Sequence, residues 1–211
     1  MNASVKLIEL VLPATVALKA LVPEEHPSAQ ILGTERFGSG VVIDPAGLIL
    51  TVNYVVLGAR SVDVALLDGA TVSANVAAQD FATGIAVLDM GRKGLAALKP
   101  GRSADLQVGQ EVFIAAAAGD NKRRASDGAI TSLRPFDAYW EYSLDRAIVT
   151  SASNPGLGGA PLLDMLGRVI GVVSLDIGEV GRFTLAIPLE HYTEHRDELL
   201  RHGRRVGGQA H

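Results

Sequence analysis

The sequence predicts an all-β fold built from β-barrels, with a helix at the C-terminal end. Short apolar or alternating segments recur along most of the chain, and turn-forming residues separate them. The chain has 23 glycines and only 5% aromatic residues, which suits many short strands joined by tight turns. Regular strand spacing with these turn signals favours antiparallel barrels over a parallel α/β sheet.

The first half of the chain predicts a hairpin and several further strands. Segment 10–21 mixes apolar runs with Pro13 and is expected to supply the opening strand. A Pro-Ala-Gly turn at 45–47 separates two apolar segments, which is a strong hairpin signal. The strands expected in this half are 10–21, 41–43, 49–52, 62–66, 71–76 and 85–90.

A linker divides the predicted strands into two sets. Proline, glycine and polar residues cluster at 99–103, so we place the boundary between two barrels there. We expect an N-terminal barrel over 1–100, a C-terminal barrel over 101–188, and a helix with a tail over 189–211. The strands expected in the second barrel are 111–115, 125–133, 147–150, 161–164, 169–176 and 182–187.

The tail has the pattern of an amphipathic helix. Leu189, Tyr192, Leu199 and Leu200 can form one apolar stripe. Residues 191–195 also spell H-x-x-E-H, a pattern that binds zinc in one class of metalloproteases. No third protein ligand is evident, so we interpret the segment as a surface helix and expect neither a metal nor a cofactor.

The glycine-rich segment 154–163, N-P-G-L-G-G-A-P-L-L, is the most specific signal in the chain. Glycines ahead of an apolar strand permit positive φ angles and the close backbone approach that an oxyanion hole requires. Such a loop normally presents a hydroxyl at its apex. Here the apex holds Leu157, Gly158 and Gly159, and none of these residues can act as a nucleophile.

Six segments in order, 37–44, 47–56, 80–88, 154–163, 167–174 and 183–188, resemble the motifs of trypsin-like serine proteases of the HtrA/DegP type. The resemblance implies two six-stranded antiparallel β-barrels of the trypsin-like type and covers the protease domain only. In that family a peptide-binding PDZ domain commonly follows the last helix. Because the chain ends at His211, we expect no PDZ domain here.

By this resemblance all three positions of the catalytic triad are substituted. Tyr54 stands where the family has histidine, Gly84 where it has aspartate, and Gly158 where it has serine. A phenol titrates near pH ~10 and is a poor general base at neutral pH. We expect Tyr54 to fill the space of the missing imidazole, with its hydroxyl bonded to water or backbone. The resemblance therefore implies a pseudoprotease that acts as a binding scaffold or regulatory module.

Other catalytic machinery is limited by composition. The chain has no cysteine, and its histidines stand at 26, 191, 195, 202 and 211, which excludes a Ser-His or Cys-His pair inside the barrels. A Ser-Lys dyad stays open, although Lys93, Lys99 and Lys122 are expected on the surface. A hydrolase that uses the Tyr54 hydroxyl or the tail histidines is the alternative enzyme hypothesis.

The expected partner is an extended peptide or protein segment. Trypsin-like folds bind substrates as an added antiparallel strand, and this pairing needs no triad. By resemblance, Ser174, Leu175 and Asp176 would form the docking strand. The loop formed by Gly156, Leu157 and Gly158 would face the peptide. A structural subunit of an assembly is a further alternative, and a homo-oligomer stays open because many HtrA-type proteins are trimers.

Composition excludes several other classes. Of the 211 residues, 48% are hydrophobic and 20% charged, which argues against disorder. A net charge of −4 argues against nucleic acid as the main partner, and we expect Arg123 and Arg124 on the surface. No segment is apolar enough to predict a membrane span. We expect a cytoplasmic location, or a periplasmic or exported one if a signal was removed.

Overall fold

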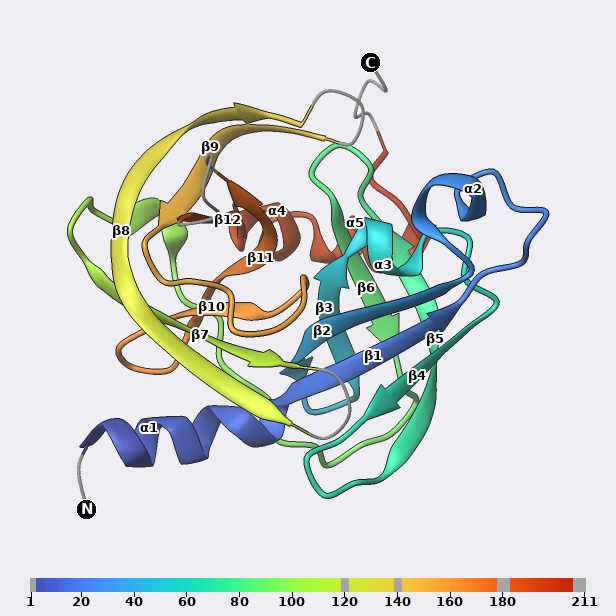
Figure 1. The fold of residues 1–211 in the computed structure, drawn as a ribbon, viewed down its shortest axis with the longest axis horizontal. Helices are drawn as coiled ribbons and strands as arrows, with labels where there is room; N and C mark the ends of the chain where they lie inside the picture. The colour runs from blue at the N-terminus through green and yellow to red at the C-terminus, as the bar shows by residue number, and fades with distance from the viewer. Residues whose placement is uncertain (1–2, 119–121, 139–141, 178–182, 207–211) are drawn as a thin grey trace.

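A computed structural model of the chain describes residues 3–118, 122–138, 142–177 and 183–206, and it contains two six-stranded antiparallel barrels (Figure 1). The first barrel has the strand order β1-β2-β3-β6-β5-β4, and β4 pairs with β1 to close it. Its strands are β1 (Thr15–Leu21), β2 (Glu35–Asp44), β3 (Leu48–Val52), β4 (Ser61–Ala65), β5 (Thr71–Gln79) and β6 (Ile85–Asp89). The predicted all-β barrel fold is confirmed.

The second barrel has the order β10-β11-β12-β9-β8-β7 and closes where β7 pairs with β10. Its β8 strand is 15 residues long and carries two register shifts, which let it bend along the barrel wall (Figure 1). The strands are β7 (Glu111–Ala117), β8 (Arg123–Asp137), β9 (Ser143–Thr150), β10 (Pro161–Asp164), β11 (Val169–Ile177) and β12 (Phe183–Pro188).

Side-chain alternation explains which faces are buried. In β4, Val62 and Val64 point into the first barrel and are almost fully buried, while the residues that alternate with them, Ser61, Asp63 and Ala65, are partly exposed. Burying one such side chain stabilises a fold by roughly 1.5–3 kcal/mol. Strand β3 is buried along its whole length, because one of its faces fills the first barrel and the other lies toward the second. This strand leads directly into the Tyr54 helix.

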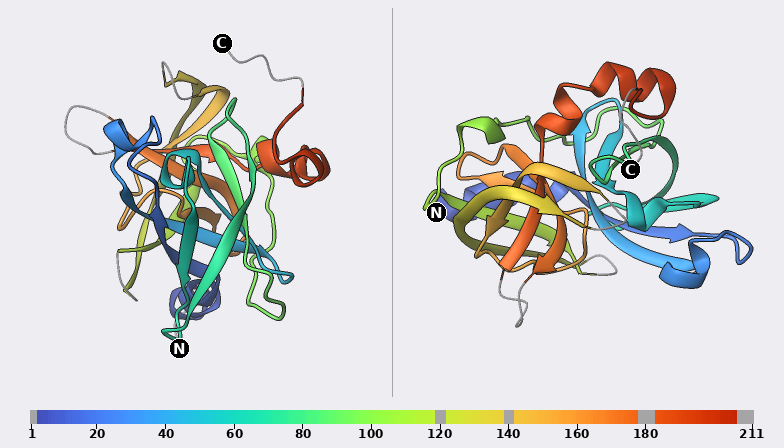
Figure 2. Two further views of the ribbon diagram at one scale, coloured as in Figure 1. Left: turned by 90° about the vertical axis from the view of Figure 1, so that its right-hand side faces the viewer. Right: turned by 90° about the horizontal axis from the view of Figure 1, so that it is seen from above.

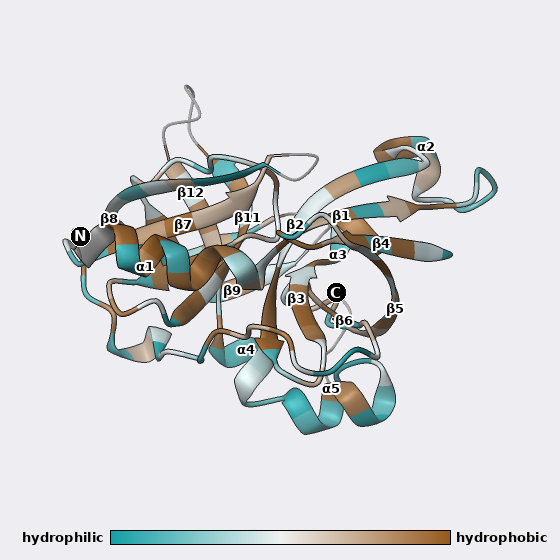
Figure 3. Cartoon of the chain, turned by 90° about the horizontal axis from the view of Figure 1, so that it is seen from below, coloured by the Kyte–Doolittle hydropathy of each residue, from teal (hydrophilic) through white to brown (hydrophobic). Residues whose placement is uncertain are grey.

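The N-terminal segment differs from the prediction. Residues 10–14 belong to α1 (Ala3–Val11) and η1 (Leu12–Ala14), and β1 begins only at Thr15. Pro13 lies in the first turn of η1, where its missing N–H costs nothing, and the Thr15 hydroxyl donates to the Val11 carbonyl at 3.1 Å. The helix α1 runs along the outside of the second barrel (Figure 3).

The C-terminal segment forms two short helices rather than one. α4 (Glu190–Thr193) and α5 (Arg196–His202) are separated by a break at residues 194–195. Leu189, Tyr192 and Leu199 are buried, as the apolar stripe predicts. The break separates the two histidines of the H-x-x-E-H pattern, and His195 instead lies 3.5 Å from Glu198. The two histidines therefore do not lie on one continuous helical face.

The chain returns to the first barrel at its C-terminal end. The Arg196 guanidinium pairs with Asp44 at 3.2 Å, and the Gln79 N–H donates to the Gly203 carbonyl at 3.0 Å. Figure 2 shows α5 beside the first barrel even though β12 belongs to the second. Two further helices, α2 (Ala29–Leu32) and α3 (Asn53–Val56), lie on the first barrel, and η2 (Ser103–Asp105) lies between the barrels in the sequence. None of the helices in the described ranges has the length and apolarity that crossing a bilayer requires.

Arg123 is not the solvated surface residue that the sequence predicted. Its side chain is partly buried, and it donates to the carbonyls of Thr15 at 2.8 Å and Ala65 at 2.7 Å. Burial lowers the pKa of this guanidinium. Because Arg123 begins β8 while its acceptors lie on β1 and β4, it joins the two barrels.

His191 on α4 should make folding stability depend on pH. Burial lowers the pKa of His191 below its ordinary value of 6.5, and the nearby Asp80 opposes part of this effect. The unfolded chain then binds more protons than the folded chain at pH values just below 6.5, so stability falls as the pH falls through that range. We expect the free energy of unfolding of His191→Gln, measured by urea unfolding, to change less with pH between pH ~7 and ~5.5 than that of the unmodified chain. An equal dependence on pH in both proteins would contradict the role of His191.

Candidate functional site

The three residues that the motif resemblance assigns to the triad lie together between the barrels. Tyr54 is in α3 directly after β3, Gly84 precedes β6, and Gly158 lies in the loop before β10. A β-carbon placed on Gly158 would overlap the hydroxyl oxygen of Tyr54 and would lie 2.9 Å from its Cζ atom. Gly84 and Tyr54 line the same cavity. The fold therefore brings the three positions together.

The Tyr54 side chain extends beyond the space of an imidazole. Its hydroxyl occupies the position that a side chain at residue 158 would take, and it donates to the Ser174 carbonyl at 3.0 Å. The expected backbone partner of this hydroxyl is thus found. The bond also joins α3 of the first barrel to β11 of the second. A serine at 158 could coexist with Tyr54 only if the ring moved.

Tyr142 is a second aromatic residue in this site, and the sequence analysis missed it. Its ring lies over Gly84, where an added β-carbon would be 2.6 Å from Cδ1. Its hydroxyl lies 2.6 Å from the Ser174 Oγ atom, and the residue is only 7% exposed. Gly84 has φ +83°, a conformation that L side chains rarely adopt. An aspartate at position 84 would therefore be strained and would collide with the Tyr142 ring.

The glycine loop uses its glycines mainly for close approach. Of Gly156, Gly158 and Gly159, only Gly159 has a positive φ, of 94°. An added β-carbon on Gly156 would overlap the Ala117 carbonyl, and one on Gly159 would overlap the Ser39 carbonyl. The Gly156 N–H donates to Asn154 Oδ1 at 3.2 Å. The Gly156 N–H is therefore engaged inside the loop.

Ser39 holds this loop between the barrels. Its backbone N–H donates to the Gly158 carbonyl at 2.8 Å, and its side-chain oxygen donates to the Ala117 carbonyl at 3.1 Å and accepts from the Ala117 N–H at 3.0 Å. The Thr51 hydroxyl donates to the Ser39 carbonyl at 2.8 Å. All of these groups are buried or nearly so, which fixes the loop relative to β2 and β7.

The segment Ser174–Ile177 of β11 has one edge without a strand partner among the described residues. β10 pairs only with the part of β11 from Val169 to Val172, whereas β12 pairs along β11 as far as Ile177. A register shift lies between Val173 and Leu175 and turns the Ser174 carbonyl toward Tyr54. Asp176 is exposed and accepts a hydrogen bond from Thr184 at 3.3 Å.

An apolar cavity of about 210 Å³ lies beside Tyr54 on the first barrel. α2, α3, the 81–84 turn and Tyr142 surround it. Its lining residues are Ser28, Ile31, Leu32, Asn53, Tyr54, Leu57, Phe81, Gly84 and Tyr142. Sequence analysis did not predict this cavity, because its walls come from four separate segments of the chain.

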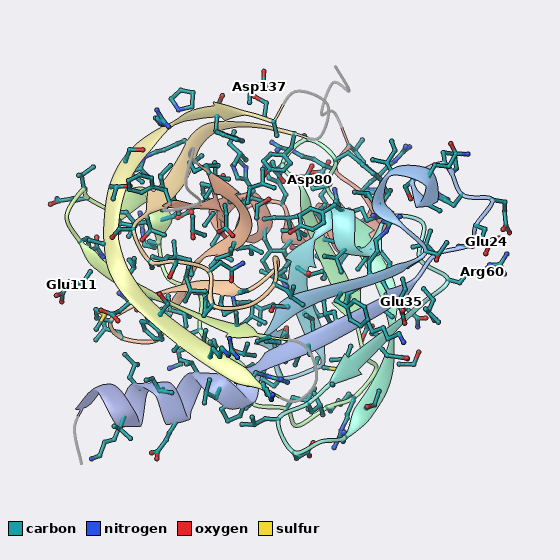
Figure 4. The ribbon with its side chains drawn as sticks, viewed as in Figure 1. Glu24, Glu35, Arg60, Asp80, Glu111 and Asp137 are labelled. Carbon is teal, nitrogen blue, oxygen red and sulfur yellow. The ribbon has the colours of Figure 1, made fainter. Side chains whose placement is uncertain are left out.

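Asp80 is the carboxylate nearest in sequence to Gly84. It is 1% exposed, and its oxygens accept from the Ala82 N–H at 3.0 Å and the Thr83 hydroxyl at 2.7 Å. Figure 4 shows Asp80 inside the outline of the molecule, whereas Glu111 and Asp137 lie at its periphery. Asp80 thus shapes the 80–84 turn, and its two oxygens are already occupied within it. Among the residues described, no group of three or more histidine and acidic side chains is arranged to hold a metal.

Comparison with known proteins identifies similar chains. The model of a family described as a trypsin-like peptidase domain matches residues 38–172. A probable periplasmic serine endoprotease DegP-like of Pseudomonas savastanoi pv. phaseolicola is 34% identical over 164 residues, which are 74% of this chain and 33% of that protein. The serine protease Do-like HtrA of Bacillus subtilis is 32% identical over 181 residues, which are 79% of this chain and 40% of that protein.

A solved structure agrees with these sequence matches. The HtrA-type protease AlgW with tripeptide superimposes with a TM-score of 0.81 at 26% identity, covering 96% of this chain and 65% of that chain. The chain spans only about a third to two fifths of the curated relatives compared above.

Proposed function

The chain belongs to the trypsin-like peptidase family, as a domain of the HtrA/DegP type, and we propose that it is a pseudoprotease that binds an extended peptide or protein segment. One observation carries the first half of this proposal. The Tyr54 hydroxyl fills the position of the missing nucleophile at Gly158. At neutral pH a phenol is protonated and cannot serve as the general base for another hydroxyl.

The free edge of β11 supports the second half. A strand that adds to this edge would pair through main-chain hydrogen bonds, which require no catalytic residue. Gly158 lies next to Ser174, since a β-carbon on Gly158 would be 3.2 Å from the Ser174 carbonyl. The similar HtrA-type protease AlgW was solved with a tripeptide. We therefore place the docking strand at Ser174, Leu175 and Asp176, with the loop of Gly156, Leu157 and Gly158 facing the peptide.

The loss of catalysis is tested by incubating the purified chain with a fluorescently labelled unfolded protein. We expect no cleavage above buffer. Turnover that copurifies with the chain and falls in Ser151→Ala or Ser153→Ala would show that a nearby serine has been recruited. That result would overturn the pseudoprotease proposal.

Strand addition is tested with an arrayed library of unstructured decapeptides, followed by single N-methylation of each backbone amide in a binder. N-methylation removes one main-chain donor while the side chains stay the same. Because successive amides of a strand face opposite sides, we expect alternating loss and retention of binding. Uniform tolerance of N-methylation, or no peptide bound at all, would contradict docking on β11.

The structure also predicts that restoring the three triad residues fails to restore activity. In Tyr54→His, Gly84→Asp, Gly158→Ser, the new aspartate stands at φ +83° against the Tyr142 ring. We expect no hydrolysis of the labelled protein and a lower Tm than the unmodified chain, by several degrees. Adding Tyr142→Ala to the triple variant is the control. It removes the collision with the ring but leaves the strained φ at position 84, so it separates these two causes of failure. Robust cleavage by the triple variant alone would contradict the prediction.

A further inference from the structure

A serine and a histidine lie in hydrogen-bond contact on the connection between β1 and β2, residues 22–34. The Nδ1 atom of His26 lies 2.8 Å from the Oγ atom of Ser28. The composition of the chain excludes such a pair inside the barrels, but this connection lies outside them and carries α2 (Figure 1). Neither residue belongs to the proposed docking strand. The chain thus holds a second group of residues with the chemistry of nucleophilic catalysis.

The backbone determines which nitrogen of the His26 ring carries the hydrogen. The Ser28 N–H donates to His26 Nδ1 at 3.2 Å, and a backbone amide can only donate. Nδ1 is therefore unprotonated in the neutral ring, and Nε2 carries the hydrogen. The ring lies against Gly58, where an added β-carbon would be 2.5 Å from Cε1. An unprotonated nitrogen held 2.8 Å from a hydroxyl has the geometry of a general base.

A buried cation adjoins the serine. Arg36 is 6% exposed, and its Nη2 atom donates to Ser28 Oγ at 2.7 Å. Its other acceptors are the carbonyls of Gly33, Tyr54 and Leu57, and no acidic side chain in the described part of the chain forms an ion pair with it. Burying a guanidinium without an opposite charge is costly. The same charge can stabilise an oxyanion that develops at Ser28.

Ser28 borders an apolar space that can hold part of a substrate. It lines the cavity of about 210 Å³, whose walls include Leu32 and Leu57. None of the described residues that line this cavity is charged. A carboxylate or ammonium group would lose its hydration there without gaining a partner, whereas a short aliphatic chain would not. The serine therefore faces a space that favours a small apolar acyl group.

We propose that His26 and Ser28 form a hydrolytic site for esters of short aliphatic carboxylic acids, with Arg36 stabilising the negative charge. Ser28 Oγ attacks the ester carbonyl carbon while its proton moves to His26 Nδ1, and the longer amide contact to that nitrogen gives way. The tetrahedral intermediate expels the alcohol, which takes the proton from Nδ1, and the acyl group stays on Ser28. Water then attacks the acyl carbon with the same base, which releases the carboxylic acid and restores the serine hydroxyl. This activity does not depend on peptide docking at β11.

Hydrolysis of p-nitrophenyl butyrate by the full chain tests the activity. We expect Ser28→Ala and His26→Gln each to lower kcat/KM by about a hundredfold or more, in the range of general acid–base catalysis, with Tm verifying the fold. His202→Gln is the matched control, because His202 is exposed on α5 and should leave the rate unchanged. Equal rates in Ser28→Ala and the unmodified chain, or an equal loss in His202→Gln, would overturn the proposal.

Covalent labelling identifies the nucleophile directly. An alkyl fluorophosphonate reacts with activated serine hydroxyls, and mass spectrometry of the digested protein locates the modified residue. We expect one adduct, at Ser28, which is lost in His26→Gln. An adduct at a different serine, or none in the unmodified chain, would show that Ser28 is not activated and that the proposal is wrong.

A thiol at the same position measures the electrostatic effect of Arg36 without a substrate. The chain has no cysteine, so Ser28→Cys introduces a single thiol beside Arg36 and His26. A nearby positive charge lowers the pKa of a thiol below its ordinary value of about 8.5. We expect the alkylation of Ser28→Cys by iodoacetamide to have its midpoint at least about 1 pH unit below that of Ser73→Cys, since Ser73 is exposed on β5. Equal midpoints would overturn the proposal.

Discussion

Gly159→Ala is expected to lower the free energy of unfolding by about 2–5 kcal/mol, from backbone strain of about 1–2 and overpacking of about 1–3 kcal/mol. Gly159 has φ +94°, which disfavours any residue with a β-carbon. The added carbon would also overlap the Ser39 carbonyl and the Thr51 hydroxyl. Both belong to the buried hydrogen-bond network between the barrels, so neither group can move without breaking a bond.

Gly109→Ala separates the two causes. Gly109 has a similar φ of +89°, but nothing lies within 4 Å of an added β-carbon. The Gly109→Ala variant should therefore lose only the unfolding free energy that comes from backbone strain, about 1–2 kcal/mol. Urea unfolding of both variants provides the comparison. If the two variants lost the same unfolding free energy, overpacking at Gly159 would contribute nothing to its loss. The loop would then not pack tightly against Ser39.

The barrel fold was predictable because its signals are local. The Pro-Ala-Gly turn at 45–47 and the alternation of Val62 and Val64 each follow from a few neighbouring residues, and both lie in the expected strands or turns. The start of the chain was mispredicted for the opposite reason. Segment 10–14 is as apolar as a strand, but its helical state depends on packing α1 against the second barrel, where Leu7 and Val11 lie next to the Gly167 position.

The sequence motifs identified three residues of the candidate site, but they did not predict which other side chains pack against these residues. Motif order identified Tyr54, Gly84 and Gly158, and the fold brings them together. Tyr142 belongs to no motif, and its contacts with Gly84 and Ser174 join segments that are 58 and 32 residues away in sequence (142 − 84 and 174 − 142). A pattern confined to neighbouring residues carries no information about such contacts. The reach of Tyr54 into the position of residue 158 likewise depends on the distance between two barrels.

Gly158→Ala tests whether the Tyr54 hydroxyl occupies the position that a side chain at residue 158 would take. The added methyl group would overlap that hydroxyl, so we expect a loss of about 1–3 kcal/mol of unfolding free energy from overpacking. Tyr54→Phe removes the hydroxyl and its bond to the Ser174 carbonyl, which costs about 1 kcal/mol by itself. In the double variant the methyl group meets no hydroxyl. Part of the Gly158→Ala loss should therefore disappear.

The four proteins form a double-mutant cycle whose coupling energy carries the conclusion. Residues in contact show couplings of about 0.5–3 kcal/mol, whereas independent sites add within about 0.5 kcal/mol. We expect the double variant to lose less unfolding free energy than the sum of the two single losses, by about 1 kcal/mol or more, because the hydroxyl that overlaps the new methyl group is gone. The phenylalanine ring still leaves its terminal carbon close to that methyl group, so part of the Gly158→Ala loss remains. Strict additivity would mean that Tyr54 points elsewhere in solution. The nucleophile position would then be open, and the observation that carries the pseudoprotease proposal would be lost.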